Sequence, residues 1–187
     1  MTDSPHLHGC PIVPGAIVAR NLTHADYDAA WLRSLGRRAA ADWHKPRDSQ
    51  RARVYRAEHG VAQRLAEPNL GSVEEAQRFV DGVVGSEWWH AAAPHRPVVT
   101  VADGRGRRSG GSIGGEIRLP RLYRTPLIVL HELAHEWVQC PVRAPHGPGF
   151  AAGFLVLVGT FQSGRVRDLL KESFEAERVA VSDRFEG

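Results

Sequence analysis

The sequence predicts an α+β fold that is mainly helical, with a small β-hairpin or sheet preceding one helix that carries paired histidines. Apolar residues recur at helical spacing in several separate segments. The stretch from Pro97 to Pro120 differs, because it combines a β-type run with glycine-rich turns. The length of 187 residues suits one sizeable core. We therefore expect an extended N-terminal arm at 1–25 and a single domain at 26–187.

The N-terminal part of the chain predicts an arm followed by scaffold helices. Prolines and glycines punctuate the first residues and disfavour helix. His6, His8 and Cys10 are spaced like a small metal clamp, although a terminus without a specific role is the preferred interpretation. Two helices are expected at 26–43 and 48–66, with Asp48 as the candidate cap of the second.

The next segment has the sequence of a capped helix. Ser72 and Glu75 form a capping box, and apolar residues continue at helical spacing to a stop near Gly85. Trp88 and Trp89 follow directly and cannot share one helical face. One of them can therefore line a groove, although core packing is the favoured role of both.

A β-hairpin is expected between Pro97 and Pro120. Val98 to Val101 and Ile113 to Leu119 have the character of strands, and Asp103 to Gly106 is turn-forming. The tip of this hairpin would carry arginines. A strand placed beside the following helix can pair with an extended peptide by edge addition.

An HExxH motif lies in the helix predicted to start at Pro126. His131 and His135 are one turn apart on the same face, so both rings can bind one metal ion. Glu132 follows the first histidine, where its carboxylate can reach a water molecule on the metal. The motif therefore predicts two zinc ligands and Glu132 as general base.

His146 is the candidate third ligand. Cys140 and Pro141 end the preceding helix, and Pro145 favours an extended approach to His146. Three protein ligands and a water molecule are typical of a catalytic zinc site, whereas structural sites usually close with four ligands. Cys140 is interpreted as a thiol that does not bind the metal, because a fourth ligand would close the site.

Two further helices are expected, from about Gly147 to Phe161 and from Arg165 to about Val181. The second is rich in acids, one of which can accept the free N–H of a ligand histidine. The acids are Asp168, Glu172, Glu175 and Glu177. Candidates to stabilise an oxyanion, chosen by nearness in sequence, are Tyr123, Arg124 and Arg143.

The composition and charge bear on the expected binding partners and the expected cellular compartment. The formal net charge is +3, and only two of the 24 basic residues are lysine. Arginine clusters at 51–56 and 105–108 leave a phosphate-binding or nucleic-acid-binding surface open as an alternative. Two cysteines are too few for a disulfide framework. Because no secretory signal or membrane-length apolar run is present, we expect a cytoplasmic protein without a membrane partner.

The stretch from His131 to Phe150 resembles the HExxH zinc metallopeptidases with a zincin-like core, particularly the SprT-like group. There, HELAH is followed by a loop and an HGxxF or HGxxW segment. It is also similar to bacterial and phage metallohydrolases that share HExxH and HGPxF. The resemblance implies a zincin-like fold, with His131, His135 and His146 as zinc ligands and Glu132 as catalytic acid/base. The zinc ribbon that SprT-like proteins often carry has no counterpart here, since no cysteine follows Cys140.

The sequence thus favours a zinc-dependent metallohydrolase, specifically a peptidase acting on a peptide or protein substrate. The alternative is a regulatory or DNA/protein-binding module that keeps zinc for stability with little or no turnover. Glu132 favours the enzyme, because a structural site has no need of a base. A hydrolase of non-peptide amides or RNA is a third option, but the spacing between His135 and His146 does not fit the RNA-processing three-histidine motif.

Overall fold

The computed structural model describes residues 47–65, 67–106, 110–138 and 144–183. The expected arm at 1–25 and the expected helix at 26–43 lie outside these ranges. So do the histidines and cysteine of the N-terminal arm, Cys140 and Arg143.

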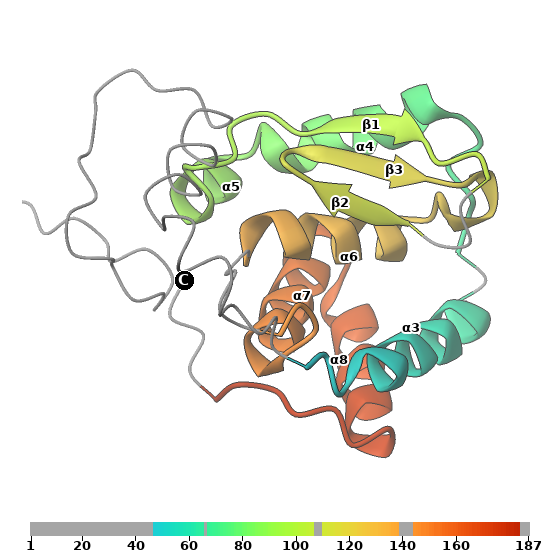
Figure 1. Cartoon of the computed structure of the whole chain (residues 1–187), viewed down its shortest axis with the longest axis vertical. Coiled ribbons are helices and arrows are strands. Elements are labelled where there is room, and N and C mark those ends of the chain that lie inside the picture. The colour runs from blue at the N-terminus through green and yellow to red at the C-terminus, as the bar shows by residue number, and fades with distance from the viewer. Residues whose placement is uncertain (1–46, 66, 107–109, 139–143, 184–187) are drawn as a thin grey trace, which may run out of the picture.

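The fold is a mainly helical α+β arrangement with a small mixed sheet, as the sequence predicts (Figure 1). The sheet comes before the helix that carries His131 and His135. In chain order the elements are α3 (Arg51–Leu65), α4 (Val73–Val84), α5 (Glu87–Ala92), β1 (Thr100–Asp103), β2 (Gly111–Ile113), β3 (Glu116–Leu119), the 3-10 helix η1 (Arg121–Tyr123), α6 (Pro126–Trp137), α7 (Pro148–Phe161) and α8 (Gly164–Ala176).

The sheet differs from the expected hairpin. Its strand order is β1-β3-β2, with β1 parallel to β3 and β2 antiparallel to β3. The hairpin therefore joins β2 to β3, and its two-residue turn is Gly114 and Gly115. Both have positive φ, 60° and 84°, a conformation that glycine adopts without steric cost. The expected pairing of Val98–Val101 with Ile113–Leu119 as a hairpin was wrong, because the glycine pair splits the second segment into two strands.

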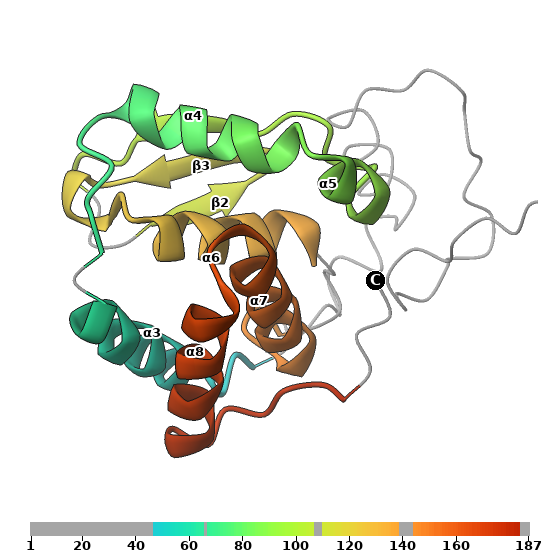
Figure 2. The same ribbon diagram turned by 180° about the vertical axis from the view of Figure 1, so that it is seen from behind.

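Helices α4 and α6 pack against the sheet, and the remaining long helices pack beneath α6. Seen from behind, α4 crosses in front of the strands (Figure 2). Helix α6 contacts β2 and β3, and α7 packs on α6. Helix α8 bridges α7 and α3. The core that results contains the fully buried side chains of Trp89, Trp137, Leu130, Leu133, Phe154 and Phe174.

Local signals set the helix ends. The capping box of α4 is confirmed, since Ser72 and Glu75 each accept the other's backbone N–H. Helix α6 begins as predicted, with Pro126 in its first turn and the Thr125 side chain accepting the N–H of Ile128. Helix α8 ends at Ala176, before the expected Val181. The chain leaves the helix at Arg178, whose φ of 55° is left-handed.

Both adjacent tryptophans are packing residues. Trp89 is completely buried and its Nε1 donates to the carbonyl of Arg96 at 2.8 Å. Trp88 packs edge-on against Trp137 and Phe161. None of the described helices is long and apolar enough to cross a membrane.

Candidate metal centre

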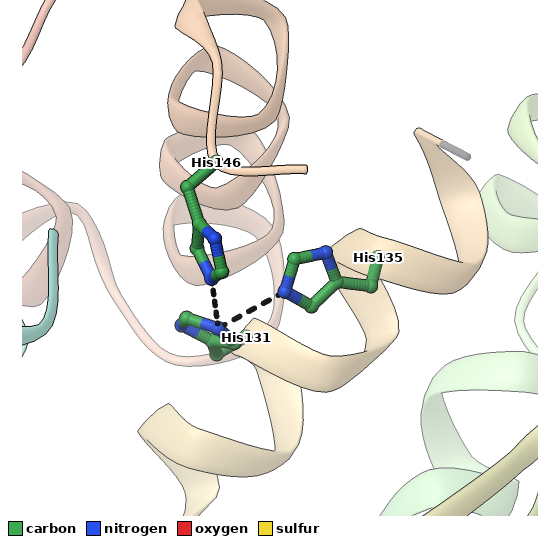
Figure 3. Close-up of side chains that lie close together, drawn as sticks. All are labelled: His131, His135 and His146. Atoms are coloured by element: carbon green, nitrogen blue, oxygen red, sulfur yellow. Dashed lines mark hydrogen bonds between the residues drawn. The ribbon is translucent and has the colours of Figure 1, made fainter. Parts of the chain in front are cut away.

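Three histidine rings converge at one point between α6 and the start of α7. Figure 3 shows His131 and His135 projecting from the same helix toward His146, which precedes α7. Nε2 of His131 lies 3.2 Å from Nε2 of His135 and 3.3 Å from Nε2 of His146. His131 and His146 are 1% and 4% exposed, and His135 is half-buried. The sequence therefore identified the three residues that the fold brings together.

These separations fit a metal ion. A tetrahedral zinc ion with bonds of about 2.0–2.1 Å holds its ligand nitrogens about 3.3–3.4 Å apart. The three candidate ligand atoms all lie within 4.8 Å of one another. Lone pairs that point at one another repel unless a cation lies between them, so this donor set suits a divalent ion that accepts imidazole.

Two carboxylates contact the outer nitrogens of these rings. Oδ2 of Asp48 lies 2.7 Å from Nδ1 of His146, and Oε1 of Glu58 lies 3.2 Å from Nδ1 of His131. A carboxylate beside Nδ1 favours a proton there and leaves Nε2 free to bind a metal. Such carboxylate–histidine pairs are typical of metal sites. An acid of α8 was expected in this role, but the carboxylates come from α3 and the segment before it.

Asp48 therefore does not act as the simple helix cap that was expected. Its Oδ1 accepts the backbone N–H of His146 at 3.3 Å. Gln50 holds the other side of the same residue, since its Nε2 donates to the carbonyl of His146 at 2.7 Å and to that of Ala180 at 3.1 Å. The third histidine is thus fixed through its ring, its N–H and its carbonyl.

Aromatic rings enclose the histidines. Phe150 stacks on His135 with ring centroids 4.3 Å apart and also contacts the other two rings. Tyr55 of α3 stacks nearly parallel on His131 at 5.4 Å and lies 5.2 Å from His146. An apolar wall of this kind limits water around a metal and strengthens the charges inside the site.

Burial and neighbouring charges separate the histidine pKa values. Burial lowers the pKa of His135 well below its ordinary value, and burial also lowers that of His146. Burial opposes protonation of His131 too, but the charge of Glu58 raises its pKa above the ordinary value. The positive charge of Arg51 acts to lower the pKa of all three rings, although burial is the larger influence on each. His135 and His146 are therefore held neutral, the form that binds metal.

Glu132 is buried beside the histidines, at 3% exposure. The start of β2 adjoins it, because a Cβ atom on Gly110 would lie only 2.6 Å from Oε1 of Glu132. Glycine is required at this position for the carboxylate to keep its place. The candidate base thus lies next to the residue from which the edge strand β2 begins.

Arg124 and Tyr123, the two candidates for stabilising an oxyanion that lie among the described residues, are found at the end of the sheet and in η1. The Arg124 side chain donates to Asp103 at 2.9 Å and to the carbonyl of Leu119 at 3.2 Å, so it secures the end of the sheet. Tyr123 is 38% exposed in η1. The group that does lie at the histidines is Tyr55. Burial raises the pKa of its phenol, and the charge of Glu132 acts in the same direction.

Sequence reasoning missed the contribution of α3. Arg51, Tyr55 and Glu58 are four and three positions apart, so they share one helical face. A signal was present, since Glu58 lies among the buried apolar residues Val54, Ala57 and Val61. A carboxylate on the apolar side of a helix requires a partner.

Comparison of the chain with models of protein families, with curated proteins and with solved structures finds no match.

Proposed function

We propose that the protein is a zinc-dependent metallohydrolase, and that it acts as a peptidase. The observation that carries this proposal is the convergence of three Nε2 atoms next to a buried Glu132. His131, His135 and His146 would hold the ion. Three protein ligands leave a coordination position open, as catalytic zinc sites require.

When bound, zinc would supply Lewis-acid polarisation of a carbonyl and acidify a water molecule. With the ion in place, Glu132 would accept a proton from a water molecule in the site and return it to the leaving amine. Its burial keeps the carboxylate out of bulk solvent, which suits a group that must accept and return a proton. Asp48 and Glu58 lie beside Nδ1 of His146 and His131, so in the neutral rings they favour the proton on Nδ1 and leave Nε2 for the ion.

Tyr55 is the donor that we assign to the developing oxyanion. Its ring covers His131, and its raised pKa keeps the phenol protonated at neutral pH. A protonated hydroxyl can donate a hydrogen bond to negative charge as it forms. This assignment replaces Tyr123 and Arg124.

The sheet supports an extended peptide as substrate. Within the described part of the chain, β2 pairs only with β3, and Gly110, the residue directly before β2, adjoins Glu132. An extended peptide added along the outer side of β2 would pass the candidate base. The opposite edge is occupied, because the Gln77 amide donates to the carbonyl of Val99 at 3.0 Å and accepts the N–H of Val101 at 2.6 Å. As far as the described residues show, the outer edge of β2 is therefore the one left for pairing.

The converging histidines and the buried Glu132 also support the zincin-like assignment that the HELAH and HGPGF segments suggest. The alternative is a zinc-stabilised binding module for DNA or protein. The basic cluster on α3 supports this alternative only weakly, because two of its arginines are already engaged within the protein. Arg53 donates to the carbonyl of Arg178, and Arg56 pairs with Glu177. A buried carboxylate beside three histidines favours turnover.

Hydrolysis of a peptide mixture by the zinc-loaded full chain tests the proposal. Products would be identified by mass spectrometry for the wild type and for Glu132→Gln, with zinc content measured on both. We expect the variant to keep its zinc and to lose at least about a hundredfold in rate, the usual contribution of a general base. Equal cleavage by both proteins, or no cleavage by zinc-loaded wild type, would contradict peptidase function.

A further inference from the structure

We infer that Arg51 makes the site selective for substrates carrying a carboxylate next to the scissile bond. This inference rests on the proposed peptidase function and specifies its substrate class. The carboxylate can be the C-terminus of a peptide or the side chain of an aspartate or glutamate.

One face of α3 carries a guanidinium, a phenol and a carboxylate in order. Arg51, Tyr55 and Glu58 follow one another at helical spacing. Glu58 contacts His131 at the inner end. Tyr55 covers His131 and His146 in the middle. The guanidinium carbon of Arg51 lies 5.5 Å from the centre of the Tyr55 ring at the outer, exposed end. Arg51 thus contacts the same aromatic ring that contacts His131 and His146.

Arg51 is the cation on this face of α3 that is available to bind a ligand. The acids of α3 and of the segment before it are engaged, Glu58 with His131 and Asp48 with His146. Among the described residues, no carboxylate lies within ion-pair distance of Arg51. Its neighbours on α3 are used differently, since Arg53 and Arg56 both bind the segment after α8.

A guanidinium in this position favours a carboxylate ligand. Its planar array of N–H donors matches the two oxygens of a carboxylate, and stacking on an aromatic ring holds the plane in one orientation. A peptide whose carbonyl is at the three-histidine site would place a carboxylate one residue away within the reach of the Arg51 side chain. One residue of extended chain spans about 3.3 Å, and the long, exposed side chain of Arg51 would cover the remainder of the two contacts of 5.4 and 5.5 Å that link it to His131 through Tyr55.

Binding without turnover provides the test. The probes are two matched pairs of N-acetylated pentapeptide pools with randomised residues. One pair differs only in a C-terminal carboxylate or amide, and the other is amide-ended and differs only in glutamate or glutamine at one fixed position. Binding to zinc-loaded Glu132→Gln would be measured by equilibrium dialysis, with and without Arg51→Ala or Arg51→Lys. Arg64→Ala is the matched control, because Arg64 lies about 20 Å further along the same helix.

We expect the carboxylate form to bind roughly tenfold more tightly in at least one pair, the scale of a partly exposed charge-assisted contact. The preference should vanish in Arg51→Ala, persist in part in Arg51→Lys and remain in Arg64→Ala. The pair that shows it identifies the source of the carboxylate. Absence of any preference, or a preference that survives Arg51→Ala, overturns the inference. Equal cleavage of all pools by wild type would then leave the peptidase proposal intact.

Discussion

Oδ2 of Asp48 lies 2.7 Å from Nδ1 of His146, although 98 positions separate the two residues in the chain. The same carboxylate accepts the backbone N–H of His146. Asp48 therefore fixes the orientation of the third histidine from outside the metal site. This contact links the segment before α3 to the segment before α7. If the three histidines bind zinc as proposed, zinc affinity should depend on Asp48, although Asp48 is not one of the three candidate ligands.

Asp48→Ala is expected to weaken zinc binding about 10–100-fold, the usual effect of removing a carboxylate behind a ligand histidine. The ring of His146 would lose its fixed tautomer and direction. Zinc affinity would be measured by competition with a chromophoric chelator. Asp168→Ala removes an exposed acid of α8 and serves as the control. Equal zinc affinities in the two variants would show that Asp48 has no such role.

Glu58 should determine how many protons are released when zinc binds. Burial disfavours the charged form of His131, but Glu58 raises the pKa of this histidine above its ordinary 6.5, so His131 is mostly protonated at pH 6.5 in the metal-free protein. Zinc must displace that proton, and zinc affinity should therefore fall as the pH drops below the raised pKa and stay level above it. The lowered pKa of His135 means that this ring releases little at the same pH.

Glu58→Gln removes the negative charge and should reduce proton release at pH 6.5. Calorimetry in two buffers with different ionisation enthalpies measures this number directly. Glu172→Gln on the exposed side of α8 is the matched control. Unchanged proton release in Glu58→Gln would contradict the assigned coupling between Glu58 and His131.

Gly110→Ala is expected to lower activity while zinc binding stays intact. The added Cβ would lie 2.6 Å from Oε1 of Glu132 and force the carboxylate to move. We expect a loss of at least about tenfold in peptide hydrolysis, since a displaced base cannot reach the water. Gly60→Ala is the control, because a Cβ there meets nothing within 4 Å. That change in a helix interior should stabilise the fold by about 0.5–1 kcal/mol.

We expect the buried ion pair of Arg96 and Glu136 to make a large contribution to the free energy of unfolding, because it holds the sheet against α6. Nε of Arg96 lies 2.7 Å from Oε2 of Glu136, with both side chains at most 2% exposed. The same oxygen accepts the N–H of Gly115 at 2.9 Å and so ties the hairpin turn to α6. Arg96→Met would leave a buried carboxylate without its cation, at a cost of about 3–5 kcal/mol.

Urea unfolding of the zinc-free protein measures this cost. Arg118→Met provides the comparison, because the pair of Arg118 and Glu116 is exposed and is expected to contribute no more than about 1 kcal/mol. Equal losses of unfolding free energy in the two variants would contradict the assignment.

The sequence predicted the three histidines and their helix because these depend on local spacing. His131 and His135 need only one helical turn, and Pro126 and Thr125 mark where that helix begins. The residues behind the ligands could not be assigned in the same way. Asp48 and Glu58 reach the histidines through the packing of α3, and no local pattern states which helix lies beside which.

The sheet shows the same limit. The strand-forming residues were recognised, but the parallel pairing of β1 with β3 depends on the path between them. Gly114 and Gly115 carried the information about the true hairpin, since two adjacent glycines favour a two-residue turn between antiparallel strands. Likewise, the early end of α8 depends on the packing of the following segment against Gln50, whose Oε1 accepts the N–H of Ala180.

The central claim is that His131, His135 and His146 form a metal centre. Elemental analysis of the purified full chain, for wild type and His146→Ala in parallel, tests it most directly. We expect one zinc ion per wild-type chain and loss or severe weakening of zinc binding in His146→Ala. Wild-type protein that takes up no zinc even when supplied with it, or a variant that retains zinc as tightly as wild type, would show that the three histidines are not a zinc site.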